Sequence, residues 1–173
     1  MKAIEYNDDL KEFLRQYNYQ SDLTNRLDKI NDTPFSQNLI NEIVLWKVNR
    51  YVSFTAEILQ KIESVKNINQ GQHREGQAVL EILLKVHGVD LPMTSAFLRF
   101  RNPRVFQIID RHAYRAVYGQ KYPLNRASRI NQKISTYFDY LDKLIELCKA
   151  KELDFQTIDR LLYKFDKKIN GKL

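Results

Sequence analysis

The sequence predicts an all-α fold, and three observations support this class. Apolar residues recur at the three- and four-residue spacing of amphipathic helices along almost the whole chain. Only 5 glycines and 4 prolines occur among 173 residues, which is too few for a turn-rich β architecture. No two segments show the alternation expected of paired strands. The length is that of a single domain with a core of ordinary size.

The first third of the chain is expected to contain three helical segments. An apolar stripe predicts a helix at residues 10–17, and a shorter segment is expected at 23–30. Ser36 can cap a third helix that runs to about residue 50. Because apolar side chains occupy nearly the whole circumference of this helix, we expect it near the centre of the fold.

The rest of the chain alternates helical segments with stop signals. Gly88 ends one helix, Asn102 and Pro103 stop the next, and Gly119 closes the helix that begins at Asp110. The predicted helices of this part cover residues 55–66, 77–86, 91–101, 110–118, 127–148 and 155–169.

Composition narrows the class of partner. The net charge of +7 and a pI near 9.4 favour a polyanionic partner, because each neutralised phosphate releases counterions. Cys148 is the only cysteine, so an internal disulfide, a multi-cysteine zinc site and an iron–sulfur cluster are excluded. No apolar run could span a membrane, and residues 1–9 lack the apolar stretch of a signal peptide. We therefore expect a soluble, cytoplasmic monomer without metal or cofactor.

Two neighbouring motifs carry most of the functional information. The first is a tight turn, Val86-His87-Gly88-Val89-Asp90, between two predicted helices. Gly88 supplies the positive φ that so short a hairpin requires, and the turn presents backbone N–H groups that suit a phosphate oxygen. The second motif is Asp110-Arg111-His112-Ala113-Tyr114-Arg115, which lies at the start of the predicted helix 110–118.

The stretch from Lys85 to Tyr118 resembles the helix-hairpin-helix DNA glycosylase superfamily, which includes endonuclease III and the adenine glycosylases. In that family a Leu-Pro-Gly-Val-Gly hairpin precedes an Asp-x-His-x-x-Arg motif, and the separation here is that of an adenine glycosylase without a gap. The close resemblance covers about a fifth of the chain. It implies a two-lobed helical domain, with one lobe from residues 36–119 and the other from 1–35 together with 120–173.

The resemblance implies a role for each matching position. Asp110 corresponds to the catalytic carboxylate, which faces the sugar of a flipped-out nucleotide and stabilises the positive charge that develops as the base leaves. A helix N-terminus favours the ionised form that this role needs, although Asp110 could equally be only an N-cap. His112 is expected to be a packed, hydrogen-bonded residue. The residues expected at the interface with double-stranded DNA are Lys85, His87, Gly88, Val89, Asp90, Arg99, Arg101, Arg104, Arg111 and Arg115.

The sequence departs from the family pattern at two positions. Asp90 replaces the second hairpin glycine, so it either caps the following helix or weakens DNA binding through its charge. Pro92 stands where bifunctional members carry a Schiff-base lysine, and proline has no amine, so β-lyase chemistry by that route is excluded.

A base-flipping enzyme also needs a pocket and a wedge. An aromatic and basic cluster at the end of the third predicted helix suits stacking on an extruded base and holding phosphate, although the same residues could simply be packed or solvated. This candidate pocket or wedge consists of Trp46, Lys47, Asn49, Arg50 and Tyr51.

The sequence thus predicts a monofunctional DNA N-glycosylase that acts in DNA repair by base excision, a hydrolase with Asp110 as its catalytic residue. The alternative is a non-catalytic helix-hairpin-helix module that binds DNA. A third interpretation is a helical interaction protein in which the motif is architecture only.

Overall fold

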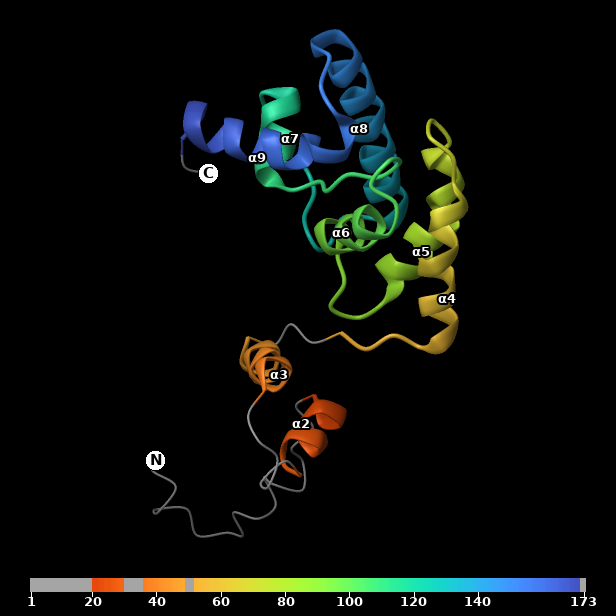
Figure 1. The fold of residues 1–173 in the computed structure, drawn as a ribbon, viewed down its shortest axis with the longest axis vertical. Coiled ribbons are helices and arrows are strands. Elements are labelled where there is room, and N and C mark those ends of the chain that lie inside the picture. Colours follow the sequence, from red (N-terminus) through yellow and green to blue (C-terminus); the bar gives the residue numbers. More distant parts are fainter. Residues whose placement is uncertain (1–19, 30–35, 49–51, 172–173) are drawn as a thin grey trace. The chain divides into compact units, whose positions relative to one another are not determined.

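The structure is a computed structural model of the chain, and it describes residues 20–29, 36–48 and 52–171. These residues form helices and irregular connections and contain no strand, which confirms the all-α class (Figure 1). They belong to two compact units, residues 1–53 and 54–173. The lobes expected from the sequence divide the chain at other positions, and that division stays a prediction.

The first unit contains two described helices, α2 (Ser21–Leu27) and α3 (Gln37–Lys47). The Ser36 hydroxyl accepts a hydrogen bond from the Leu39 amide at 3.2 Å, so the predicted cap is confirmed. The two helices are joined by a hydrogen bond of 2.9 Å from Trp46 Nε1 to Thr24 Oγ1. The predicted first helix at 10–17 lies outside the described residues.

The central position expected for α3 stays a prediction, and within its own unit the helix is covered on one side. Leu39 is its only buried residue, and several apolar side chains that the sequence places around the helix are exposed. The physical reason is that α2, with seven residues, covers one side of α3 and leaves the rest of its apolar surface uncovered by this contact. The exposed apolar residues on and beside α3 are Ile40, Val44, Leu45 and Val48.

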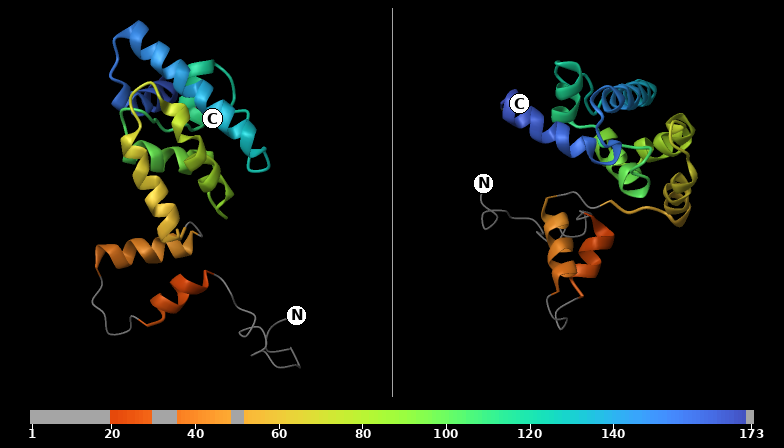
Figure 2. Two further views of the ribbon diagram at one scale, coloured as in Figure 1. Left: turned by 90° about the vertical axis from the view of Figure 1, so that its right-hand side faces the viewer. Right: turned by 45° about the horizontal axis from the view of Figure 1, so that its top comes forward.

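The second unit contains the remaining helices, with short 3₁₀ turns at Val65–Asn67, His73–Gly76 and Phe155–Thr157. Its helices are α4 (Ala56–Ser64), α5 (Gln77–Lys85), α6 (Leu91–Arg101), α7 (Arg111–Tyr118), α8 (Ile130–Lys151) and α9 (Ile158–Ile169). Figure 2 shows their arrangement from two further directions. The sequence predicted each of them, with differences of a few residues at the ends.

One apolar core holds this unit together, and every helix from α5 to α9 contributes buried residues to it. Burying large aliphatic and aromatic side chains contributes about 1.5–3 kcal/mol each to folding. The largest fully buried side chains of this core are Leu80, Leu83, Leu91, Leu98, Phe106, Ile109, Tyr137, Tyr140, Leu141, Leu144 and Ile158.

The turn between α5 and α6 has the geometry that the sequence predicts. Gly88 adopts φ +84°, in the region that favours glycine, and the Val89 amide donates to the Val86 carbonyl at 3.1 Å. Asp90 is the N-cap of α6, with Oδ1 accepting from the Leu91 amide at 2.8 Å.

An irregular connection at residues 102–110 leads from α6 to α7, and buried hydroxyl groups hold it in place. Tyr137 donates to the Gln107 carbonyl and Tyr140 donates to the Ile108 carbonyl, each at 2.9 Å. The Ser95 hydroxyl accepts from the Ile109 amide at 3.2 Å. Because satisfied buried hydrogen bonds resist displacement, these contacts fix the backbone immediately before Asp110.

Candidate functional site

Asp110 lies at the end of this connection and caps α7. Its Oδ1 accepts a hydrogen bond from the Ala113 amide at 2.7 Å, and Gly119, with φ +66°, ends the helix. The Asp110 side chain is half-buried, so the carboxylate remains open to solvent on one side. The bond to the Ala113 amide fixes the carboxylate at the N-terminus of α7.

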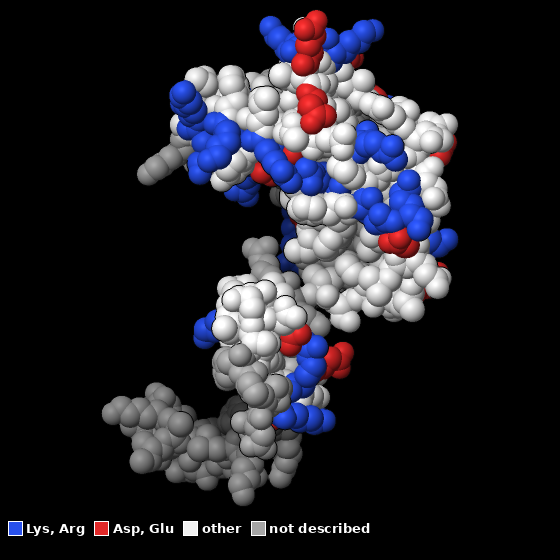
Figure 3. Space-filling model, viewed as in Figure 1, with Lys and Arg blue, Asp and Glu red and all other residues white. Residues whose placement is uncertain are grey.

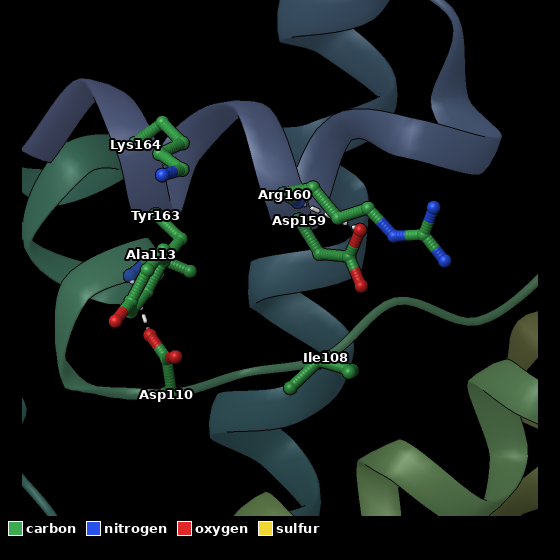
Figure 4. A pocket seen from close by; sticks show the side chains of 7 residues that line it. All are labelled: Ile108, Asp110, Ala113, Asp159, Arg160, Tyr163 and Lys164. Atoms are coloured by element: carbon green, nitrogen blue, oxygen red, sulfur yellow. Dashed lines mark hydrogen bonds between the residues drawn. The ribbon is translucent and has the colours of Figure 1, made fainter.

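A cavity of about 380 Å³ opens beside Asp110. Figure 4 shows the connection, with Ile108 and Asp110, along one side and the side chains of α9 along the other. The lining therefore combines two carboxylates, two cations and an aromatic ring with aliphatic surface. Its residues are Ile108, Asp110, Ala113, Asp159, Arg160, Tyr163 and Lys164.

A buried carboxylate on α9 holds this helix against α7. Asp166 has no exposed surface, and its two oxygens accept hydrogen bonds of 2.8 Å from Nε and Nη2 of Arg115. His112 Nδ1 lies 2.7 Å from Asp166 Oδ2, and Asn170 donates to Oδ1 at 2.7 Å. Arg115, with Asn170 and His112, holds the pKa of Asp166 well below its usual range. Figures 1 and 2 show α7 and α9 side by side.

His112 and Arg115 of the second motif therefore have structural roles. His112 packs edge-on against the Tyr163 ring, with the ring centroids 5.0 Å apart. Arg115 also donates to the Gly171 carbonyl at 2.8 Å. Both side chains thus join α7 to the C-terminal segment, whereas Asp110 and Ala113 are the motif residues that line the cavity.

The hairpin exposes part of the surface expected to meet DNA. Lys85, His87 and Gly88 are exposed, whereas Val89 is buried in the core. The amide groups of Gly88 and Met93 donate to no acceptor among the described residues, so they are available to an anion.

The charge of Asp90 has a partner. Lys133 of α8 lies with its Nζ 2.8 Å from Asp90 Oδ1 and also donates to the Arg126 carbonyl at 3.1 Å. The pKa of Tyr122 is raised, chiefly by burial and then by the charges of neighbours that include Asp90 and Asp110. The Tyr122 ring packs edge-on against the Tyr114 ring of α7, with the ring centroids 5.5 Å apart.

The arginines expected to bind DNA fall into two groups. Arg99 is buried, with Nε 3.5 Å from Asp159 Oδ2 and Nη2 donating to the Gln156 carbonyl at 3.0 Å. Arg101 pairs with Glu63 of α4. Arg104 and Arg111 are exposed, so of these four only they present a guanidinium to solvent without a carboxylate partner among the described residues.

The predicted base pocket or wedge is described only in part. Trp46 is half-buried in the first unit, where it contacts α2, and Lys47 is exposed. Asn49, Arg50 and Tyr51 lie outside the described residues.

The contribution of α9 to the cavity was not predicted from the sequence. Arg160 and Lys164 are exposed and line it together with Asp110. The signal available in the sequence was their four-residue spacing, which places both on one face of a helix. Nothing in the sequence indicated that this face would lie opposite Asp110, about fifty residues earlier in the chain.

Comparison with protein-family models, with curated proteins and with solved structures found no match. Among residues 20–29, 36–48 and 52–171, no helix combines the length and apolar character needed to cross a membrane. In the same residues no group of three or more His, Cys, Asp and Glu side chains is placed to hold a metal ion.

Proposed function

We propose that this chain is a monofunctional DNA N-glycosylase of the helix-hairpin-helix type, with Asp110 as its catalytic residue. The observation that carries the proposal is the position of Asp110, which caps a helix and lines a cavity opposite two cations. A carboxylate held in this way suits stabilisation of positive charge on a sugar.

The chemistry requires little movement of Asp110. Its Oδ1 is bound by the Ala113 amide, and its other oxygen accepts no hydrogen bond from the described residues. That oxygen is free to stabilise the oxocarbenium-like charge or to accept a proton from the attacking water. The base leaves as the bond from its nitrogen to the sugar C1′ breaks, and the water oxygen forms the new bond to C1′.

The hairpin supplies a site for the DNA backbone. The Gly88 and Met93 amides donate to no acceptor among the described residues, and with exposed Lys85 they suit phosphate oxygens of double-stranded DNA. Pro92, inside the first turn of α6, offers no amine, so the proposed activity ends at an abasic site and does not cleave the strand through a Schiff base at this position.

A non-catalytic DNA-binding module is the second candidate, and a specific observation favours it. The hairpin needs no second glycine, because Asp90 has φ −129° and caps α6, and its charge is paired with Lys133. His112 and Arg115 of the second motif bind Asp166. In the fold these residues therefore have structural roles that require no catalytic activity.

The test is an excision assay on a panel of duplexes that carry single damaged or mispaired bases. The proposed function expects base release from at least one duplex, with strand breakage only after alkaline treatment. Asp110→Asn should slow release by ~100-fold or more. Asp154→Asn is the matched control, because Asp154 also caps a helical turn, at the Gln156 amide, but does not line the cavity. Binding without release on every duplex would favour the second candidate.

A further inference from the structure

We propose that Arg160 and Lys164 of α9 bind the two phosphates that flank the nucleotide whose sugar faces Asp110. The inference rests on the proposed function and adds to it a site for the DNA strand at the cavity rim. It also moves an essential part of the DNA interface from the arginines of α6 to the C-terminal helix.

The first observation is which cations are already paired. In unit 54–173 the guanidinium groups of Arg99, Arg101 and Arg115 are engaged by carboxylates of Asp159, Glu63 and Asp166. Arg160 and Lys164 form no ion pair with any described residue, and both are exposed. Their full charge is therefore available to a ligand, whereas a phosphate could reach Arg99 only by displacing a buried contact.

The second observation is their geometry. Residues four apart on a helix lie on one face, about one 5.4 Å turn apart along the axis. Figure 4 shows Lys164 with Tyr163 and Ala113 toward one end of the cavity, and Arg160 with Asp159 toward the other, its guanidinium extended away from the Asp110 end. A nucleotide has one phosphate on each side of its sugar, so two cations at two ends of the cavity match its chemistry.

The third observation concerns charge balance. Asp110 and Asp159 both line the cavity, and the Asp159 carboxylate is already engaged by Arg99 and by the Arg160 amide. A DNA strand that approaches Asp110 meets a like charge, which disfavours binding unless nearby cations offset it. Figure 3 shows Lys and Arg side chains in a row across the visible face of this unit, from α9 towards α4.

The experiment measures binding of the full chain to a duplex that carries one tetrahydrofuran abasic analogue, over a series of salt concentrations. Arg160→Gln and Lys164→Gln remove the charge and leave a shorter, polar side chain. Each is expected to weaken binding by about 5- to 10-fold and to lower the salt slope by about 1. Lys168→Gln is the control, because it removes the same charge from the same helix at an exposed position that does not line the cavity. Circular dichroism and urea unfolding check that each variant is folded.

A second duplex assigns the contact to particular phosphates. In this duplex the two phosphates that flank the analogue are replaced by uncharged methylphosphonates. The wild-type chain should bind it less tightly than the normal duplex. The double variant Arg160→Gln/Lys164→Gln should bind both duplexes equally, because the contacts are already lost.

The outcomes separate this inference from the proposed function. If the variants bind as the wild type does, or lose no more than Lys168→Gln, Arg160 and Lys164 do not bind phosphate, and the proposed function still stands. If the double variant binds the methylphosphonate duplex less tightly than the normal duplex, the loss from the substitutions and the loss from methylphosphonate are additive. In that case the two cations contact other phosphates and the inference is wrong. If the wild-type chain binds no duplex at low salt, the proposed function and this inference both fail.

Discussion

The carboxylate of Asp166 on α9 accepts two hydrogen bonds from the guanidinium of Arg115 on α7, although the two residues lie 51 positions apart. His112 approaches the same carboxylate, so two members of the Asp-x-His-x-x-Arg motif contact one buried group. This group holds α9, which forms the opposite side of the cavity, against α7, whose N-cap is Asp110. The motif therefore contributes to the site in two ways, by lining the cavity and by holding its walls together.

The first prediction concerns the stability of this junction. Asp166→Asn keeps the volume and removes the charge that Arg115 faces, so the free energy of unfolding should fall by on the order of 3 kcal/mol. Urea denaturation measures the change. Asp139→Asn, at an exposed position of α8, should leave stability within about 0.5 kcal/mol of wild type. A loss for Asp166→Asn as small as that of the control would contradict the structural role of the pair.

The second prediction is the acid dependence that follows from the same carboxylate. Its pKa is lowered in the folded chain by Arg115, Asn170 and His112, while in the unfolded chain it is about 3.9. The unfolded state therefore takes up the proton first, so the stabilisation is complete above about pH 5 and is lost as pH falls through the unfolded pKa towards the lower pKa of the folded state. The midpoint of urea unfolding should fall between about pH 5 and pH 2.5, and less steeply in Asp166→Asn. Parallel profiles for the two proteins would show that other carboxylates cause the acid dependence.

Much of the fold could be predicted because its signals are local. Ser36, Thr55 and Asp110 cap helices through hydrogen bonds to amides three residues ahead, and Gly88 and Gly119 adopt positive φ at the turns where the pattern ended. Such contacts depend only on the type of a residue and on its short, fixed distance along the chain from its partner. Residue type and spacing can both be read from a single sequence.

The long-range contacts could not be predicted in the same way. Arg99 resembles any exposed arginine of a short helix, yet it is buried against Asp159 and Gln156, 57 residues from the latter. Gly76 gave no turn signal, and its lack of a side chain matters because a Cβ there would lie 2.8 Å from the Phe106 ring. Both features arise from the packing of distant segments, which periodicity does not encode.

The third prediction concerns the charge at the hairpin. Asp90 has φ −129°, which any residue adopts without strain, so glycine is not required there. Asp90→Asn keeps a side chain that can cap α6 and removes a negative charge beside the proposed phosphate site. DNA affinity should rise a few-fold, while Asp90→Gly should lower the free energy of unfolding by about 1 kcal/mol because the cap contact and the Lys133 partner are lost. Fluorescence anisotropy with a labelled duplex measures the affinity. Unchanged affinity in both variants would show that the hairpin does not contact phosphate.

The fourth prediction concerns Pro92. Because proline carries no primary amine, borohydride should trap no covalent adduct between the chain and any duplex that it processes. Denaturing gel electrophoresis of the borohydride-treated reaction detects such an adduct. Trapping would show that another amine forms a Schiff base, and exposed Lys85 and Lys164 would be the first candidates for substitution.

The last prediction separates capping from catalysis at Asp110. Asparagine caps a helix about as well as aspartate, so Asp110→Asn should keep the bond to the Ala113 amide and cost well under ~1 kcal/mol of stability. Asp110→Ala removes that bond and should cost about 1 kcal/mol. Both substitutions remove the carboxylate, so both should slow base release by ~100-fold or more, the size expected when a preorganised charge is lost.

The two variants should also bind DNA at least as tightly as the wild type, because the repulsion between a carboxylate and the phosphates disappears. If Asp110 were only a cap, base release would instead follow stability, and Asp110→Asn would be nearly as active as the wild type. Single-turnover excision, urea unfolding and duplex binding on the same three proteins distinguish the two cases. Release by Asp110→Asn at the wild-type rate would disprove the catalytic role and leave DNA binding as the remaining function of the hairpin.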